Sequence, residues 1–420
     1  MKIQQTELPN GVVVITESQS AFASATIGVW VENGSRHETP ELNGVSHFYE
    51  HMVFKGTQKR DPLEQVQAIE AKGGYINAYT TRDHTCFYTK VVEQEIGVAT
   101  DVLCDMINAP LLEKEEFTKE KEVILEEVRA SIDAPEDIIH DLFAEALWGQ
   151  TGLGQPIAGY LKTVKSIDIK DLRSYQTKVK SKFRVVVSAA GAVNHKKFVK
   201  MVEEALNTQK SLKSHKAKFQ PPIPKHFVKK KDVQQCNVVL GTAIGATDRR
   251  QQIAMNIVNS IFGDGMASRL FQVIREEHGL AYSVYSCMDN YSDTMCFSLC
   301  MTLEDKKFEQ AMQILNDEIC KFKTDGATQE EFDQAKDSLK GGLQLSLEST
   351  SARMNFMVRQ FLRRPSEEIL KPVQILKLID EVTLDDVNSL LPEIFNKKDW
   401  ASALIQPKDS KLSVKKWLKF

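Results

Sequence analysis

The 420-residue chain has no run of about 18 apolar residues, so no segment is a candidate for a membrane-spanning helix. It lacks an excess of either charge: 54 Lys and Arg stand against 57 Asp and Glu, which argues against a nucleic-acid-binding protein. Its seven cysteines form no Cys-x-x-Cys pair, which is typical of reduced thiols rather than of a disulfide framework. The first residues have neither a secretory segment nor an Arg-rich presequence. We expect a cytoplasmic protein of bacterial type, with a mature organellar matrix protein as the alternative.

The clearest internal boundary is the stretch 220–231 (QPPIPKHFVKKK), whose prolines cannot continue a helix or occupy a central strand. A chain of this length exceeds one ordinary hydrophobic core, so two domains are expected. We therefore predict an N-terminal domain over residues 1–219, a linker over 220–231 and a C-terminal domain over 232–420.

Both halves present strand and helix patterns in the same order, which indicates two copies of one architecture. In the first half the predicted strands are 11–16 and 24–32, the stretch 75–92 is predicted as a strand or a hairpin, and the helices are 45–54 and 62–72. In the second half the predicted strands are 237–244 and 281–285, and the helices are 249–262 and 268–278. Further amphipathic stretches lie near 162–179, 308–322 and 329–347. The predicted fold class is α+β, with two related domains that each contain an antiparallel-rich sheet flanked by helices.

Residues 47–51 (HFYEH) carry the strongest chemical signal in the chain. On a helix, His47 and His51 lie one turn apart on one face, so both imidazoles can reach a single metal ion. Glu50 falls beside the same position and can accept a proton from water without being a ligand. The alternative is an ordinary helix with two surface histidines. The pattern favours a metal centre, because only nine histidines occur in the chain.

A peptidase zinc site needs a third protein ligand, and residues 113–131 (EKEEFTKEKEVILEEVRAS) supply the best candidates. The apolar stripe of this predicted helix consists of Phe117, Val123, Ile124 and Val128. Glu120 lies four residues before Ile124 and Glu127 four after Val123, so both are expected on or beside the inward face. Because a buried carboxylate needs a partner, we predict Glu127 as the third ligand and Glu120 as an auxiliary carboxylate.

These segments resemble the pitrilysin/insulinase family, peptidase family M16, whose members carry an inverted His-x-x-Glu-His motif. The resemblance rests on GVSHFYEHMVFKGT (44–57), KEVILEEV (121–128), GGYINAYTTRDHTCFY (73–88), AAGAVNH (189–195) and SRLFQVIREEHGLAYSVYS (268–286). It covers essentially the whole chain and is strongest to the short members, the mitochondrial processing peptidase subunits and their bacterial relatives. It implies a zinc endopeptidase of unfolded or short peptides, with presequence-like peptides as one sub-class.

The resemblance implies that His47, His51 and Glu127 hold one zinc ion per chain, with Glu50 as the general base. The matching position for the auxiliary glutamate of the family is Glu120. Two histidines and one carboxylate suit zinc, although manganese or cobalt could substitute.

Four further residues match substrate-binding positions of the family. Arg275 and Tyr282 match an Arg/Tyr pair that binds the substrate backbone and steadies the tetrahedral intermediate. From the residues alone, a surface ion pair and a packed tyrosine are the alternative interpretation. Asn77 and Ala78 match edge-strand positions to which a substrate peptide adds as an extra strand.

The metal motif and the Arg/Tyr pair stand in one chain, whereas some heterodimeric relatives divide them between subunits. We therefore expect a homodimer in which Arg275 and Tyr282 act on the partner's site, with a heterodimer of related subunits as the alternative. The rival functions are a non-catalytic structural subunit of this fold and a metal-binding partner subunit of a separate protease. Peptides or unfolded polypeptides are the expected partners; nucleic acids and membranes are not.

Overall fold

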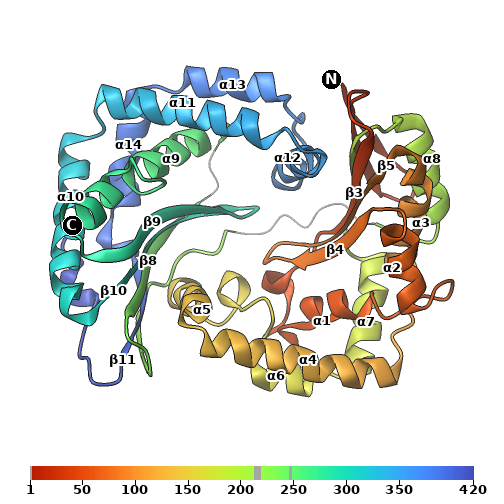
Figure 1. The fold of residues 1–420 in the computed structure, drawn as a ribbon, viewed down its shortest axis with the longest axis horizontal. Helices are drawn as coiled ribbons and strands as arrows, with labels where there is room; N and C mark the ends of the chain where they lie inside the picture. The colour runs from red at the N-terminus through yellow and green to blue at the C-terminus, as the bar shows by residue number, and fades with distance from the viewer. Residues whose placement is uncertain (1, 212–218, 246–247) are drawn as a thin grey trace. The chain divides into compact units, whose positions relative to one another are not determined.

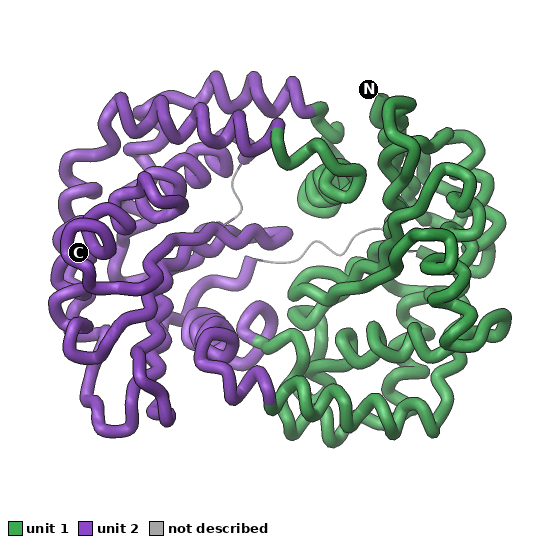
Figure 2. The backbone as a smooth tube through the Cα atoms, in the orientation of Figure 1, with its two compact units in different colours: residues 1–129, 155–216, 345–371 green, residues 130–154, 217–344, 372–420 purple. Residues whose placement is uncertain are grey.

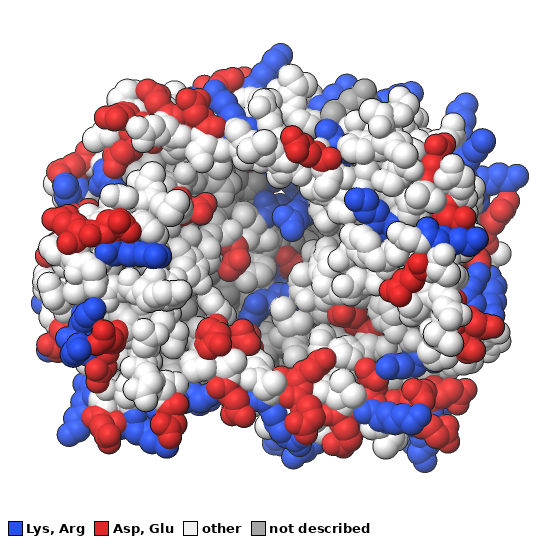
Figure 3. Space-filling model, in the orientation of Figure 1, with Lys and Arg blue, Asp and Glu red and all other residues white. Residues whose placement is uncertain are grey.

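The structure is a computed structural model that describes residues 2–211, 219–245 and 248–420. The chain folds as two compact units (Figure 2). Unit 1 consists of Met1–Arg129, Gln155–Lys216 and Leu345–Lys371; unit 2 consists of Ala130–Gly154, Ala217–Gln344 and Pro372–Phe420. Lys and Arg are interspersed with Asp and Glu over the face in Figure 3, as the balanced composition predicts. None of the described helices is long and apolar enough to cross a membrane.

Unit 1 is built on a six-stranded sheet of order β1-β2-β6-β3-β5-β4 (Figure 1). Its strands are β1 (Lys2–Glu7), β2 (Val13–Ser18), β3 (Ser24–Val31), β4 (Tyr75–Thr80), β5 (Thr85–Val92) and β6 (Val185–Gly191). All neighbouring pairs are antiparallel except β2 and β6, which are parallel. The central strand β6 is buried throughout because helices cover both faces there, and its run VVVSAAG is accordingly without large polar residues.

Unit 2 is built on a five-stranded sheet of order β7-β11-β8-β10-β9. Its strands are β7 (His226–Lys231), β8 (Cys236–Gly245), β9 (Ala281–Asn290), β10 (Thr294–Leu303) and β11 (Ala401–Pro407). The pair β7 and β11 is parallel and the others are antiparallel. With β1 set aside, the two sheets have the same strand order and the same single parallel pair. The predicted duplication is therefore confirmed at the level of topology, and so is the predicted α+β fold.

The helices of unit 1 lie close to the predicted positions. They are α1 (Val45–Met52), α2 (Pro62–Glu70), α3 (Ile96–Asn108), α4 (Lys114–Asp133), α6 (Leu161–Ser166), α7 (Ile169–Ser181) and α8 (His195–Ala205), of which α4 runs on into unit 2. The single stretch predicted near 162–179 is two helices, because Asp168 caps a new helix by accepting from the amides of Lys170 and Asp171. Helices α3 and α8 pack together against one face of the sheet.

The helices of unit 2 follow in the corresponding order. They are α5 (Pro135–Trp148), α9 (Arg249–Phe262), α10 (Phe308–Asp325), α11 (Gln329–Ser346), α13 (Pro372–Glu381) and α14 (Leu384–Ile394). The predicted helix 268–278 is a π-helix over Phe271–Glu277. An aromatic cluster forms the centre of this unit's core and consists of Phe262, Phe297, Phe322, Phe395 and Trp400.

Two helices are exchanged between the halves of the sequence. Helix α5 comes from the first half but packs on β8 and β11 of unit 2, where Phe143 and Leu147 meet Val239 and Ile405. Helix α12 (Thr350–Arg363) comes from the second half but packs on β2, β3 and β6 of unit 1. Its apolar residues Met354, Met357, Val358 and Phe361 cover a sheet face lined by Val13, Ile15, Trp30 and Val186. Each sheet therefore depends on a helix from the other half for one covered face.

This exchange corrects the predicted domain boundaries, because compact units need not be contiguous in sequence. Residues 130–154 and 345–371 belong to the units opposite to the predicted ones. The predicted linker 220–231 is also partly structured: residues 226–231 form the edge strand β7, paired in parallel with β11. Prolines and lysines occur both in linkers and at edge strands, so the sequence pattern of this stretch did not distinguish the two. The segment just before residue 219, 212–218, lies outside the described residues.

Candidate metal centre

Helix α1 is held at its start by a buried carboxylate. Glu38 accepts hydrogen bonds from the backbone amides of Gly44 and Ser46, each at 2.7 Å, and from the side chain of Asn43 at 2.9 Å. Burial raises the pKa of Glu38 to about 7, although these hydrogen bonds act in the opposite direction. Gly44 has φ +100°, and a Cβ there would lie 2.8 Å from the carbonyl oxygen of Ala158. The helix therefore starts at a defined residue and orientation.

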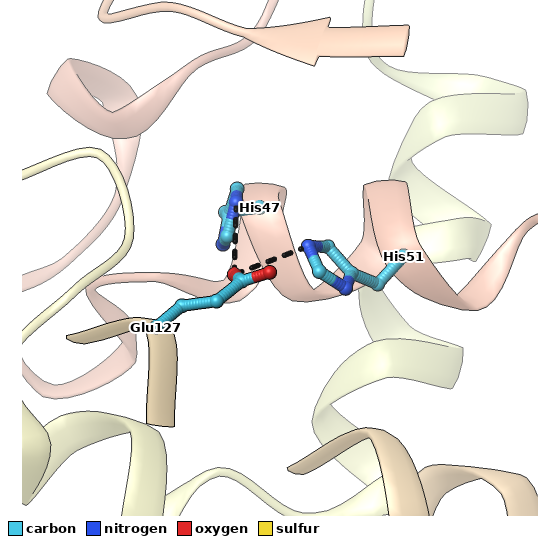
Figure 4. Close-up of side chains that lie close together, drawn as sticks. All are labelled: His47, His51 and Glu127. Carbon is cyan, nitrogen blue, oxygen red and sulfur yellow. Dashed lines mark ion pairs between the residues drawn. The ribbon is translucent and has the colours of Figure 1, made fainter. Parts of the chain in front are cut away.

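The same helix presents two histidines on one face. The apolar side buries Val45, Phe48 and Met52, which leaves His47 and His51 side by side with ring centroids 4.7 Å apart. Their Nε2 atoms lie 3.9 Å and 3.5 Å from the same oxygen, Oε2 of Glu127, which comes from α4 (Figure 4). The predicted ligand set thus converges, with one ligand atom from each residue within 4.8 Å of the others.

These distances fit a shared metal ion. Tetrahedral zinc bonds of about 2.0–2.2 Å place two ligand atoms roughly 3.4 Å apart, close to the separations observed here. Burial, and to a lesser extent the neighbouring His51, lowers the pKa of His47 to about 4. The ring is therefore neutral at neutral pH, as a metal ligand must be. Two histidine nitrogens and one carboxylate oxygen are a donor set that suits zinc.

A second carboxylate orients one ligand. Glu120 of α4 is buried, with 7% of its surface exposed, and its Oε1 lies 2.9 Å from Nδ1 of His51. This contact leaves Nε2 of His51 directed at Glu127. The other oxygen of Glu120 lies 2.6 Å from the ammonium nitrogen of Lys55, so the buried carboxylate has two partners. Glu120 is therefore bound to one member of the converging set, and its role as an auxiliary carboxylate stays a prediction.

Glu50 lies beside the ligands without belonging to them. The hydroxyl of Thr80, on strand β4, donates a hydrogen bond to Oε2 of Glu50. Burial raises the pKa of Glu50, while the hydrogen bond from Thr80 and the charge of His51 lower it. A carboxylate with a raised pKa next to a metal site is suited to receive a proton and return it.

The predicted position of Glu127 beside the two histidines is confirmed and its role as a ligand stays a prediction, whereas the predicted inward face of α4 is partly wrong. Glu127 was placed inward because it follows Val123 by one turn, but Val123 is 45% exposed and the side chain of Glu127 is 46% exposed. The core of α4 consists instead of Phe117, Ile124, Leu125 and Val128. Glu127 meets the histidines from the margin of this apolar face rather than from its centre.

Arg275 and Tyr282 lie together in unit 2. Arg275 is on the π-helix, and the centre of its guanidinium is 5.9 Å from the ring centroid of Tyr282 at the start of β9. Tyr282 is 76% exposed, so the alternative of a packed tyrosine is wrong. The nearest carboxylate that pairs with Arg275 is that of Glu276, at 4.0 Å.

Asn77 and Ala78 lie on β4, the edge strand of unit 1. They pair on one side with Tyr88 and Phe87 of β5. Asn77 is exposed, and its side chain accepts a hydrogen bond from the amide of Ala78 at 2.8 Å. That amide is bonded to a side chain rather than to β5, so it lies on the unpaired edge of the strand.

Three contributors were missed by the sequence analysis: Glu38, Lys55 and Thr80. Lys55 lies four residues after His51 and just beyond the end of α1, and this nearness in sequence is the signal that could have identified it. Glu38 and Thr80 reach α1 from a loop and a strand, so no local pattern in the sequence connects them with the motif.

The sequence of this chain is similar to known proteins along most of its length. Residues 13–160 match the family model described as insulinase (peptidase family M16), and residues 166–339 match the model described as peptidase M16 inactive domain. An uncharacterized zinc protease of Bacillus subtilis is 35% identical over 95% of this chain and 97% of its own length. An uncharacterized zinc protease of Streptomyces coelicolor is 35% identical over 98% of this chain and 91% of its own.

Solved structures show the same fold. A protease from Helicobacter pylori superimposes with a TM-score of 0.87 at 20% identity, covering 97% of this chain and 100% of that one. A protein from Pseudomonas fluorescens described as a peptidase M16 inactive domain superimposes with a TM-score of 0.88 at 17% identity, covering 98% of this chain and 99% of that one.

Proposed function

Because this chain belongs to the insulinase family, peptidase family M16, we propose that it is a zinc-dependent endopeptidase that hydrolyses unfolded or short peptides. The observation that carries the proposal is the convergence of His47, His51 and Glu127, with the carboxylate of Glu50 close enough to interact electrostatically with His51 and Glu127. The names of the relatives, uncharacterized zinc proteases, support both the metal and the reaction class. We propose one zinc ion per chain, supported by the one group of candidate ligands among the described residues.

Zinc held by His47, His51 and Glu127 would supply Lewis acidity, which lowers the pKa of water well below its ordinary value and polarises a carbonyl. Glu50 accepts the proton of the attacking water and delivers it to the leaving amine nitrogen. The raised pKa of Glu50 supports this exchange, because a carboxylate that holds its proton more tightly receives it more readily. Thr80 holds Glu50 by its hydrogen bond, and Glu120 holds His51.

The substrate would lie as an added strand on β4, along the exposed edge that includes Asn77 and Ala78. Arg275 and Tyr282 would bind its backbone and stabilise the oxyanion. The exposure of Tyr282 supports a role towards a ligand, since a 76% exposed tyrosine contributes little to a core. A homodimer, with this pair acting on the partner's site, is the assembly that we propose, and the bacterial relatives favour the cytoplasm as its location.

The test is cleavage of a short, unstructured, internally quenched peptide by the purified protein. We expect cleavage that stops with a chelator and returns with zinc, whereas manganese or cobalt restore it to different extents. Glu50→Gln should reduce turnover by about 10²–10⁴-fold with zinc content unchanged. Normal turnover by that variant would show that Glu50 is not the base.

A non-catalytic structural or partner subunit is the second candidate. The observation that favours it is the match of residues 166–339 to a family model described as inactive. It predicts a protein that binds zinc and peptides stoichiometrically yet cleaves none of a varied peptide set. Presequence-like, basic substrates are the finer proposal taken from the family resemblance, and assays with basic and acidic peptides of equal length would test it.

A further inference from the structure

Helix α12 carries a polar stripe on the side that faces strand β4. Asn355, Arg359 and Arg363 are spaced four residues apart, so they lie along one face of the helix, one turn after another. This helix belongs to the second half of the sequence but packs on the sheet of unit 1. It therefore brings two arginines to the sheet that carries the metal centre.

The stripe follows β4 towards the turn that leads to β5. The hydroxyl of Tyr79 donates a hydrogen bond to Oδ1 of Asn355 at 3.3 Å. The charge of Arg359 acts on Tyr79 and on His84, and the charge of Arg363 interacts with Asp83. The three residues of the stripe thus lie beside successive positions of the segment from Tyr79 to His84.

Both arginines lack a neutralising carboxylate. Among the described residues, neither Arg359 nor Arg363 forms an ion pair or donates a hydrogen bond to a carboxylate, and Arg359 is exposed. The nearby acid, Asp83, is bound to Arg36 at 2.9 Å. Burial, with the charges of Arg364 and Arg359, lowers the pKa of Arg363 to about 10. A partly buried cation without a partner favours an anionic ligand.

The alternation of side chains along β4 indicates how the two arginines of α12 lie relative to Glu50. Thr80 directs its hydroxyl at Glu50 on the α1 side of the sheet, whereas its neighbour Tyr79 directs its hydroxyl at α12. A peptide strand added to the outer edge of β4 alternates in the same way, with successive residues about 3.3 Å apart. Every second side chain of the peptide then faces the polar stripe of α12, close to the position along β4 at which Thr80 contacts Glu50.

We propose that Arg359, supported by Arg363, binds an acidic side chain of the substrate within about two residues of the scissile bond. This inference rests on the proposed zinc endopeptidase function and replaces its basic, presequence-like substrate class with another: peptides with Asp or Glu beside the cleavage site. A lysine or arginine at the same position is disfavoured by like charge. Presequence-like basic peptides are then poor substrates unless they carry an acid at this position.

The experiment measures binding separately from cleavage. Fluorescent peptides that are identical except for Glu, Gln or Lys at one scanned position are titrated with the zinc-loaded Glu50→Gln protein, and the Kd is read from anisotropy. The same peptides are given to the wild-type enzyme to obtain kcat/KM. Arg359→Gln, Arg359→Lys and a control, Lys200→Gln, are compared; Lys200 is an exposed lysine on α8 of the same unit.

At one or two scanned positions, we expect Glu to bind about tenfold more tightly than Gln, and Lys more weakly than Gln. Arg359→Gln should abolish the difference, Arg359→Lys should retain part of it, and Lys200→Gln should leave it unchanged. Equal binding of the three peptides, no binding at all, or a preference unaffected by Arg359→Gln would overturn the inference. Selective binding without cleavage by the wild type would instead overturn only the proposed function.

Discussion

The two sheets share a strand order and differ in what the chain places beside them. In unit 1 the helix that follows the second common strand is α1, eight residues long, with His47, Glu50 and His51 on its open face. In unit 2 the corresponding helix is α9, with 14 residues, and its buried face consists of apolar residues such as Met255, Ile257 and Phe262. The same topology therefore supports either a metal site or an extended core at this position.

The starts of the two helices explain part of this difference. Helix α9 begins with a capping box, in which Asp248 accepts from the amide of Gln251 at 2.8 Å at an exposed site. Helix α1 begins at a left-handed glycine and is capped by the buried Glu38. The exposed cap Asp248 allows the start of α9 to shift slightly. The buried cap Glu38, with three donors, fixes the position of α1, which carries His47 and His51. The more constrained helix start is therefore found in the unit that carries the candidate metal centre.

The largest expected effect is the loss of zinc when one candidate ligand of unit 1 is removed. It tests whether unit 2 can supply a replacement ligand. His51→Ala should lower zinc affinity by more than the roughly 10–100-fold that loss of an outer-shell partner costs, and no zinc should remain after dialysis. Metal content is measured by mass spectrometry, beside His278→Ala in unit 2 as the control. Zinc retained by the His51 variant would mean that a second ligand set exists.

The next effect tests whether unit 2 takes part in the reaction. Tyr282→Phe removes one hydroxyl from an exposed ring and should lower kcat/KM by about 10²-fold, as the loss of an oxyanion donor does. Zinc content should not change, and Tyr285→Phe on the same strand serves as the matched control. An unchanged kcat/KM would mean that unit 2 supports the structure but takes no part in the reaction through Tyr282.

A third effect concerns acid stability and is specific to unit 1. Burial lowers the pKa of His84 to about 4, whereas the unfolded state titrates near 6.5, so between these values the unfolded chain binds more protons. The stability that this neutral histidine contributes is complete above pH 6.5 and is lost as the pH falls towards 4. From pH 7 to 5, the wild type should lose about 2 kcal/mol relative to His84→Gln. Urea unfolding at both pH values measures this difference, and parallel pH profiles would contradict it.

The smallest effect tests how far the support of the metal site extends. Lys55→Met removes the partner of Glu120, which holds His51, so zinc affinity should fall by about tenfold. Lys55→Arg preserves the charge and should bind zinc almost as the wild type does. Competition with a chromophoric chelator measures both affinities. If Lys55→Met and Lys55→Arg were indistinguishable, Glu120 would not need its ion pair.

Local patterns predicted the site well because its central residues lie on two helices. The four-residue spacing of His47 and His51 needs only helical geometry, and the glutamate on α4 follows from the need for a third ligand. The direction of Glu127 could not be derived reliably, since Val123 is apolar yet exposed. Hydrophobicity indicates a preference for burial, but it does not say which apolar side chains find a partner.

Residues that act across the fold escaped prediction for a different reason. Thr80 reaches Glu50 and Arg359 reaches β4 only because strands and helices distant in sequence come together. The duplication was visible as a repeated order of elements, but the exchange of α5 and α12 was not. Both helices have an apolar face that would suit either sheet, so amphipathicity alone does not choose between them.

Because α12 comes from the second half of the sequence, unit 1 is completed late in the synthesis of the chain. When residue 216 has been synthesised, unit 1 still lacks Leu345–Lys371, and the sheet face with Val13, Ile15 and Trp30 has no cover. At about 5–20 residues per second, the ribosome needs roughly ten to thirty seconds to supply the missing helix. During that time the nascent chain exposes an apolar surface that a chaperone can hold. Unit 1 is thus completed only near the end of translation, after Leu345–Lys371 has been synthesised.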